Sequence, residues 1–262
     1  MPIALTIAGS DSGGGAGIQA DLKTFASLGV HGTSAITCLT AQNPQGVRGI
    51  SPSPPHMVRK QIEAVFEELP PAAVKTGMLY SAEIIREVIR VFSQKTRPPL
   101  IVDPVMVATS GARLLKPAAL DLLKEELLPL ATLVTPNLAE AEILVGTKLR
   151  SVQDMRDAAK EIHARFNCAA LVKGGHLQGL KQAIDVFYDG EDEFLLSAPF
   201  IKSIHPHGTG CTYSAAVAAY LAKGCPLPKA VALAKDYISN AISQGRLAAG
   251  HFVLNTFHKK NA

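Results

Sequence analysis

The order of apolar runs near the N-terminus constrains the fold of this chain most. A short apolar run over residues 3–8 leads into the glycine-rich segment 9–17, and a segment with helical periodicity follows over residues 18–28. A second strand-like run covers residues 32–41. Consecutive strands that are joined through a helix pair in parallel, so this order predicts a βαβ unit and a parallel sheet.

The same alternation continues along the chain. We expect further helices over residues 54–69, 81–94, 117–127, 138–145, 151–165 and 228–244. We expect further strands over residues 72–76, 100–103, 131–135 and 169–173, and a hairpin of residues 183–188 and 193–197 that turns at Asp189-Gly190. No linker or repeat interrupts the pattern. The chain is therefore predicted to form one α/β domain over residues 1–262, a doubly wound, mostly parallel sheet with helices on both faces.

Composition argues against several classes of function. The net charge of +4 (26 Lys+Arg against 22 Asp+Glu) is spread along the chain, and aromatic residues make up only 5% with no Trp, so nucleic acid is not an expected partner. The 4 cysteines contain no C-x-x-C, which argues against disulfides and zinc. No signal peptide is visible, and the apolar stretch at residues 215–222 is too short to span a membrane. We therefore expect a cytoplasmic protein.

One segment predicts an anion site. Gly208, Thr209, Gly210 and Cys211 stand just ahead of an alanine-rich run over residues 214–221 that is predicted to be helical, and the Gly-Thr-Gly segment 208–210 is predicted to be the N-terminus of that helix. The first N–H groups of a helix have no partner within it and carry partial positive charge, which suits a phosphate. The same field can lower the pKa of the Cys211 thiol. The alternative is a capped helix start that binds nothing.

Polar residues follow several of the predicted strands. In open α/β sheets, ligands bind outside the carboxyl ends of the strands. Asp103, Asn137 and Glu140 lie there and offer oxygen ligands suited to Mg²⁺, while Lys173 could reach a nucleotide phosphate. Taken singly, each of these residues is more often a helix cap or a solvated surface residue.

The glycine pattern alone does not decide the nucleotide. Gly15-Ala16-Gly17-Ile18-Gln19-Ala20 fits a loose dinucleotide-binding pattern, but the second strand ends in Gln42-Asn43 and lacks the acidic residue of such a site. The G-K-[ST] signature of P-loop enzymes is also missing. Anion loop, oxygen ligands and lysine together favour a kinase of another class.

Seven segments, in order along the chain, resemble one family. It is the hydroxymethylpyrimidine/phosphomethylpyrimidine kinases of thiamine biosynthesis, in the ribokinase-like superfamily. The segments are AGSDSGGGAGIQADLK (residues 8–23), LTAQN (39–43), KTGML (75–79), VDPVMV (102–107), TPNLAEAE (135–142), LVKGGH (171–176) and HGTGCT (207–212). The chain departs from the family at His205-Pro206-His207, where Asn-Thr-His is usual.

The resemblance implies a reaction. MgATP would phosphorylate 4-amino-5-hydroxymethyl-2-methylpyrimidine to its monophosphate, and then the monophosphate to the diphosphate. Cys211 would take the place of the base, and residues 208–211 would form the anion hole. Thr209, Lys173 and Asn137 would contact ATP. Asp103, Asn137 and Glu140 would hold Mg²⁺. The family is usually homodimeric.

The resemblance also implies a substrate pocket. Gln42 would bind the aminopyrimidine edge, since a carboxamide offers both a donor and an acceptor. Asp21 would hold the hydroxymethyl end, Met78 and Val105 would flank the ring, and Gly9 would line the site.

Two alternatives stay open at this point. A pyridoxal kinase shares the superfamily and also acts on a flat ring with a hydroxymethyl group. A non-catalytic pyrimidine-binding protein would keep the pocket without turnover. Gln42 and the long glycine loop favour the pyrimidine kinase.

Overall fold

A nine-stranded sheet runs through the computed structural model, which describes residues 1–94, 96–106, 115, 117–175, 177, 181–200 and 207–258. His205 and Pro206 of the departure noted above lie outside these residues. The strand order is β3-β2-β1-β4-β5-β6-β7-β8-β9. The strands are β1 (Ile3–Asp11), β2 (His31–Asn43), β3 (Gly46–Pro52), β4 (Ala73–Thr76), β5 (Leu100–Val102), β6 (Leu133–Val134), β7 (Ala169–Lys173), β8 (Gln182–Tyr188) and β9 (Glu193–Pro199).

The strands from β2 to β7 in this order are parallel, and antiparallel strands extend both edges. β3 pairs with β2 at one edge, while the predicted hairpin of β8 and β9 continues from β7 at the other. A separate small hairpin consists of β10 (Arg246–Ala248) and β11 (His251–Val253). The prediction of a mostly parallel sheet is confirmed.

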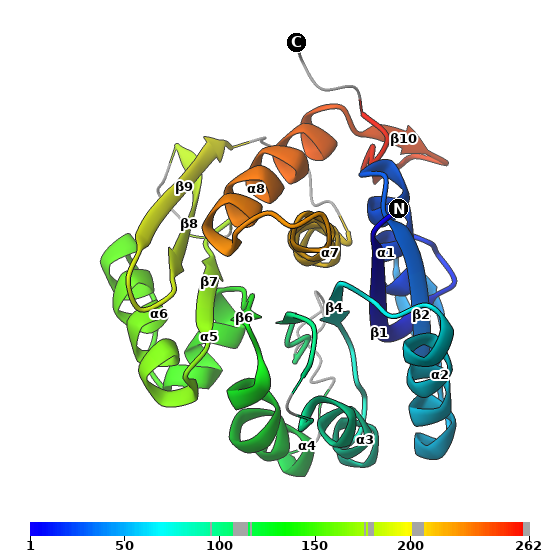
Figure 1. The fold of residues 1–262 in the computed structure, drawn as a ribbon. Coiled ribbons are helices and arrows are strands. Elements are labelled where there is room, and N and C mark those ends of the chain that lie inside the picture. Colours follow the sequence, from blue (N-terminus) through cyan, green and yellow to red (C-terminus); the bar gives the residue numbers. More distant parts are fainter. Residues whose placement is uncertain are drawn as a thin grey trace.

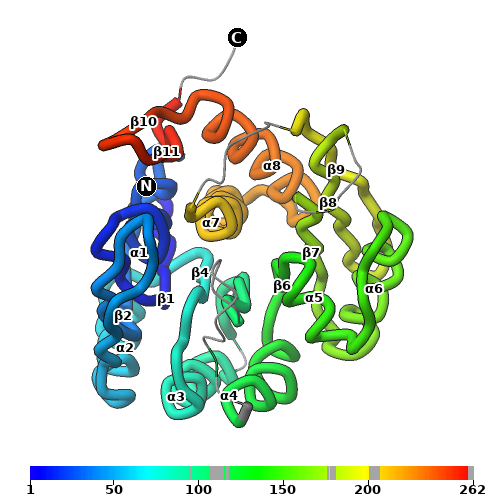
Figure 2. The backbone as a smooth tube through the Cα atoms, turned by 180° about the vertical axis from the view of Figure 1, so that it is seen from behind, coloured from blue at the N-terminus to red at the C-terminus, as the bar shows by residue number. Residues whose placement is uncertain are grey.

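Helices cover both faces of the sheet (Figures 1 and 2). One layer holds α1 (Gly17–Ser27), α7 (Thr209–Ala222) and α8 (Leu227–Ser243). The other holds α2 (Pro55–Glu68), α3 (Ala82–Phe92), α4 (Pro117–Leu122), α5 (Leu138–Val145) and α6 (Val152–Phe166). Both views look nearly down the axis of α7, which lies between the middle of the sheet and α8. The predicted doubly wound arrangement is therefore confirmed.

Three local features differ from the prediction. The strand β3 and the β10–β11 hairpin were not expected, because their residues are mostly exposed and show no apolar face for a pattern to reveal. Pairing through the backbone, which any sequence can supply, forms them. The helix expected over residues 117–127 is α helical only as far as Leu122 and continues as a π turn over Leu123–Leu127.

Side chains alternate between two cores on the parallel strands. The core under α7 receives Ala4, Ala73, Ile101, Leu133 and Leu171, one from each of five strands. The next position on the same face, two residues further on, is polar in every case, because the period of a strand is two. These residues are Thr6, Lys75, Asp103, Thr135 and Lys173. A polar row therefore crosses the sheet beneath the first turns of α7.

A buried ion pair lies in this row and joins α1 to β4. Nζ of Lys75 is 2.9 Å from Oδ1 and 2.8 Å from Oδ2 of Asp21, and both side chains are fully buried. Thr6 on β1 donates a hydrogen bond of 2.6 Å to the same carboxylate. Burial alone would lower the pKa of Lys75, but the charge of Asp21, with Asp103 adding to it, outweighs burial and raises it. Lys75 is therefore a cation inside the protein.

Among the described helices, none combines the length and the apolar composition that a membrane span needs.

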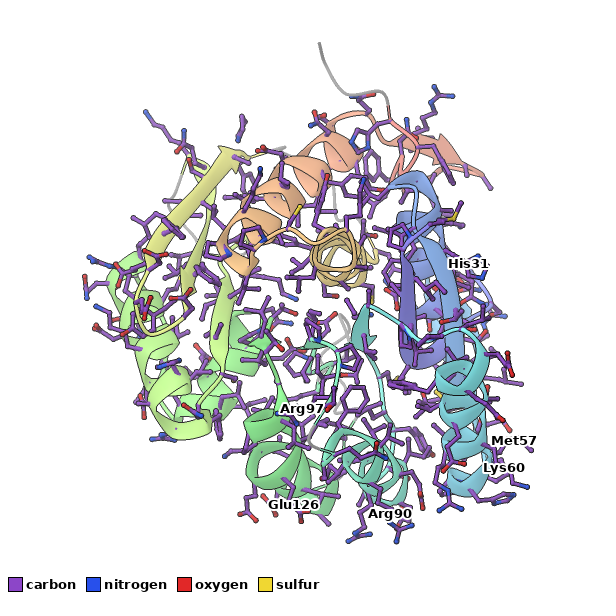
Figure 3. The ribbon with its side chains drawn as sticks, in the orientation of Figure 1. His31, Met57, Lys60, Arg90, Arg97 and Glu126 are labelled. Carbon is purple, nitrogen blue, oxygen red and sulfur yellow. The ribbon has the colours of Figure 1, made fainter. Side chains whose placement is uncertain are left out.

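Replacing Lys75 tests the importance of this pair. Lys75→Met leaves the Asp21 carboxylate buried without its partner, and we expect the free energy of unfolding to fall by about 3–5 kcal/mol. The control is Arg90→Met. The Arg90 side chain is 62% exposed, pairs with Glu87 at 2.8 Å and projects outward from α3 in Figure 3. We expect a loss below about 1 kcal/mol there. Urea unfolding measures both, and equal losses would contradict the assignment.

Candidate active site

The glycine loop and the start of α7 lie directly against each other. α7 begins at Thr209, as predicted, and is capped by Gly208, whose φ is +83°. A Cβ on Gly208 would lie 1.7 Å from the carbonyl oxygen of Gly15, so only glycine fits. A Cβ on Gly210 would lie 3.2 Å from Nζ of Lys173. The first turn of α7 thus meets the glycine loop on one side and a lysine on the other.

Asp11, at the end of β1, organises the glycine loop. Its carboxylate accepts hydrogen bonds from the amides of Gly13 at 2.8 Å, Ala16 at 2.8 Å and Gly15 at 3.1 Å. Burial would raise the pKa of Asp11, but the bonds from His207, Ala16 and Gly13 outweigh burial and lower it to about 2. No role for Asp11 is predicted from the sequence. An aspartate two residues before a run of glycines is the signal that could have found it, because its side chain bonds to the backbone a few residues on.

Gln42 lies between the glycine loop and the residue that leads into α7. Its backbone N–H donates to Oγ of Ser12 at 2.8 Å, and its backbone carbonyl oxygen accepts from the same hydroxyl at 2.7 Å. Its carboxamide lies 2.9 Å from Nε2 of His207 and 3.1 Å from Oγ1 of Thr40. Gln42 is thus held in place and partly exposed.

The expected ring-flanking residues start from neighbouring strand ends. A Cβ on Gly9 would lie 2.8 Å from Sγ of Cys38 and 4.0 Å from Cβ of Met78, so Gly9, Met78 and Cys38 are brought together. Val105 follows β5 with φ of +43°. The left-handed region is strained for a β-branched residue, and such strain concentrates at ligand sites.

Asp103 and Lys173 form the second ion pair of the polar row. Nζ of Lys173 lies 3.1 Å from Oδ1 of Asp103. Ser214 on α7 donates to Oδ2 of Asp103 at 3.2 Å, and Thr135 donates to Oδ1 at 3.4 Å. Burial would lower the pKa of Lys173, but Asp103 and Glu140 outweigh burial and raise it. Lys173 is therefore charged, as an ATP-phosphate ligand must be.

Asn137 and Glu140 form a reciprocal cap at the start of α5. The amide of Glu140 donates to Oδ1 of Asn137 at 3.0 Å, and the amide of Asn137 donates to Oε2 of Glu140 at 2.9 Å. The amide of Met106 donates to Oε1 of Glu140 at 3.2 Å. Burial raises the pKa of Glu140 to about 7, with Lys173 opposing and Asp103 adding to the rise. The two residues that cap α5 are thus the same two that were predicted to bind Mg²⁺.

These residues fit Mg²⁺ in part. Within the described parts of the chain, no cluster of three or more His, Cys, Asp and Glu side chains is arranged to hold a metal ion. Mg²⁺ needs fewer protein ligands than that, since it keeps several waters and takes one or two carboxylates together with substrate phosphates. Burial raises the pKa of Glu140 and the charge of Asp103 adds to the rise; a bound cation would relieve the repulsion between the two carboxylates.

Cys211 lies in the first turn of α7 and is partly exposed. The amide of Gly17 hydrogen-bonds to its sulfur, and the buried charge of Lys75 also favours the thiolate. Burial nevertheless dominates and, with Asp103 and Asp21 adding to it, raises the pKa of Cys211 to about 11. The expectation of a lowered pKa is wrong, because loss of solvation outweighs the field of the helix N-terminus.

Asp21 lies behind the site and not on its surface. It was expected to touch the hydroxymethyl group of a substrate, but its side chain has no exposed surface, and Lys75 and Thr6 occupy its carboxylate oxygens. The charge of Lys75, a residue for which the sequence predicts no role, acts on both Asp21 and the sulfur of Cys211.

Alkylation tests the state of Cys211. Because the thiolate is the reactive form, we expect the rate of iodoacetamide modification at Cys211 to keep rising up to about pH 10, whereas an ordinary thiol with a pKa of about 8.5 levels off sooner. Peptide mass spectrometry separates Cys211 from Cys225, which is also partly exposed and serves as the internal reference. A rate at Cys211 that levels off below about pH 9 would contradict the raised pKa.

Comparison with known proteins identifies the family. Over residues 11–256 the chain matches the family model described as phosphomethylpyrimidine kinase. The chain belongs to this family. The family inferred from the seven sequence segments is thereby confirmed.

Individual relatives agree with the phosphomethylpyrimidine kinase family. A hydroxymethylpyrimidine/phosphomethylpyrimidine kinase of Rhizobium meliloti is 50% identical over 262 residues, covering 95% of this chain and 97% of the relative. The thiamine biosynthesis bifunctional protein of Geobacter sulfurreducens is 49% identical over 96% of this chain, which spans only 51% of that relative's length. The ADP complex of Bacillus subtilis pyridoxal kinase superposes with a TM-score of 0.90 at 40% identity, covering 98% of this chain and 97% of that structure.

Proposed function

We propose that this protein uses ATP to phosphorylate 4-amino-5-hydroxymethyl-2-methylpyrimidine, and then phosphorylates the monophosphate to the diphosphate. One observation carries the proposal. In this member of the phosphomethylpyrimidine kinase family, the glycine loop contacts the start of α7, and Gln42 contacts the residue that precedes it. Ring recognition needs a residue such as Gln42, and phosphoryl transfer needs the loop and the first turn of α7. The product serves thiamine biosynthesis, the process that the name of the Geobacter sulfurreducens relative gives.

The first turn of α7 supplies the electrostatic part of the mechanism. The amides of residues 208–211 point out of the helix start and stabilise the charge that spreads over the transferring phosphoryl group. Lys173 beside Gly210 adds a positive charge to the ATP phosphates, and Thr209 adds a hydroxyl. Asp103, Asn137 and Glu140 would hold Mg²⁺, which when bound neutralises phosphate charge.

Cys211 orients the acceptor hydroxyl more than it removes its proton. At neutral pH a thiol with a pKa of about 11 is protonated. A loose transition state for phosphoryl transfer needs little base strength, so a positioned thiol suffices. As the acceptor oxygen bonds to the phosphorus and the bond to the leaving ADP breaks, the hydroxyl proton passes to an oxygen of the transferred phosphoryl group. Lys75 favours negative charge beside Cys211, and Asp21 holds Lys75 in place.

The proposal extends to substrate pocket and assembly. Gln42 binds the aminopyrimidine edge, while Met78, Val105 and Gly9 border the ring. Residues 1–262 act as one kinase domain in a cytoplasmic homodimer. Four free cysteines support a reducing compartment.

Pyridoxal phosphorylation is the second candidate. The likeness to the Bacillus subtilis pyridoxal kinase, with a TM-score of 0.90 at 40% identity, is the observation in its favour. The higher identity of 50% to the Rhizobium meliloti relative places the pyrimidine first.

Product masses test the proposal. With MgATP and the hydroxymethylpyrimidine, we expect a monophosphate that is followed by a diphosphate, and we expect far slower turnover of pyridoxal. Pyridoxal phosphate alone would move the assignment to the second candidate. Binding of the pyrimidine without any product would indicate a non-catalytic binding protein.

Variants assign the roles within the same assay. Cys211→Ala should lower kcat by about 100-fold or more while ring binding persists, because one positioning contact at the reacting atom is lost. Cys225→Ala is the matched cysteine control and should keep the full rate. A full rate for Cys211→Ala would refute its role.

Gln42→Ala should weaken pyrimidine binding by about 1–3 kcal/mol with a smaller effect on kcat.

A further inference from the structure

The carboxamide of Gln42 has a partner at each of its two polar atoms. In the structure Oε1 faces Oγ1 of Thr40 at 3.1 Å, and Nε2 faces Nε2 of His207 at 2.9 Å. The oxygen and the nitrogen of a carboxamide have nearly the same shape, so the surrounding donors and acceptors decide which is which.

Thr40 requires a donor from Gln42. The Thr40 hydroxyl has one proton, and Oγ1 lies 3.0 Å from the carbonyl oxygen of Ser10, which can only accept. If that proton went to Gln42 instead, Oγ1 of Thr40 and the carbonyl oxygen of Ser10 would face each other at 3.0 Å without a proton between them. With the proton on Ser10, Thr40 accepts, and the atom of Gln42 at 3.1 Å has to be the NH₂ group.

His207 requires an acceptor from Gln42. Nε2 of His207 also lies 3.4 Å from Oδ2 of Asp11. The low pKa of Asp11, about 2, keeps this carboxylate ionised, so it can only accept. A lone pair on Nε2 would face this negative carboxylate, so Nε2 carries a proton. The same Nε2–H then meets the atom of Gln42 at 2.9 Å, which has to be the carbonyl oxygen. Both sides give the same orientation independently.

We propose that Thr40 and His207 are specificity-determining positioning residues that hold the Gln42 carboxamide with its NH₂ toward Thr40 and its oxygen toward His207. The amide then keeps one free N–H and one free lone pair for a ligand, in a fixed order. A ring with a complementary order is accepted, and a ring with donor and acceptor exchanged is rejected, because buried polar groups stay unpaired. This inference rests on the proposed function of Gln42 as the ring-binding residue.

His207 gives the arrangement a further property. It directly precedes Gly208, the cap of α7, and its ring lies against Gly15, whose Cβ would come within 2.9 Å of Cδ2. The residue that orients the ring-binding amide is thus next in sequence to the turn that holds the phosphoryl group. The position of the ring-binding amide and the position of the phosphate site therefore both depend on His207.

Nuclear magnetic resonance tests the orientation without any substrate. Long-range ¹H–¹⁵N correlation spectra of the full chain report which imidazole nitrogen carries a proton, and His207→Gln assigns the signal. We expect Nε2 of His207 to be protonated at neutral pH, in the neutral or the cationic form. A neutral ring protonated at Nδ1 alone would make Nε2 an acceptor and would overturn the proposal.

Substrate discrimination tests the consequence. We compare kcat/KM for the 4-amino pyrimidine with that for its 4-oxo analogue, in which donor and acceptor are exchanged. Wild type should prefer the amino compound by on the order of 100-fold or more. Thr40→Val removes the acceptor that fixes the amide, so this ratio should fall about tenfold, and Thr40→Ser should restore it.

Thr33→Val is the matched control for this experiment. Thr33 lies on the same strand, is as buried as Thr40 and also donates to a carbonyl oxygen, that of Ala4 at 3.1 Å. The ratio of kcat/KM for the amino compound to that for the oxo compound in Thr33→Val should equal that of wild type. An unchanged ratio in Thr40→Val would overturn the proposal. If wild type phosphorylates neither pyrimidine, the proposed function fails, whereas the orientation of Gln42 is still decided by the spectrum of His207.

Discussion

The structure depends on charges that are buried beneath the first turns of α7. Lys75 pairs with Asp21, Lys173 pairs with Asp103, and each pair ties a strand end to a helix or to another strand. Buried charges of this kind are costly unless they are paired and hydrogen-bonded, and both pairs satisfy that condition. The row makes the carboxyl ends of the strands polar on the side where α7 begins. A helix N-terminus, two lysines and a thiol are thereby gathered at one place that suits a reacting phosphate.

The site also needs a close approach of two segments that are far apart in the sequence. Gly208 packs on the Gly15 carbonyl, and Asp11 holds the loop through three backbone amides. The loop brings Ser12 to the backbone of Gln42, so the residue proposed to bind the ring is fixed by the same loop that supports α7. In the proposed function, ring binding and phosphoryl transfer therefore share one structural support.

Much of this could be predicted from the sequence, because strand–helix alternation and helix-start residues carry local signals. Asn137 illustrates the limit, since the pattern indicates an oxygen ligand while the structure shows a helix cap, and one side chain can serve as both. The sequence could not place Asp21 behind Lys75, because which of two buried charges faces a ligand depends on packing between α1 and β4. The direction of the pKa shift of Cys211 was also missed, since desolvation depends on the complete fold.

The most direct test of the account is a crystal structure of this protein with the hydroxymethylpyrimidine and a non-hydrolysable ATP analogue. We expect the pyrimidine edge to contact the carboxamide of Gln42 and the hydroxymethyl oxygen to lie beside Sγ of Cys211. We also expect the terminal phosphate of the analogue to bind the amides of residues 208–211, next to Lys173. A pyrimidine bound away from Gln42, or a terminal phosphate bound away from the start of α7, would contradict the account.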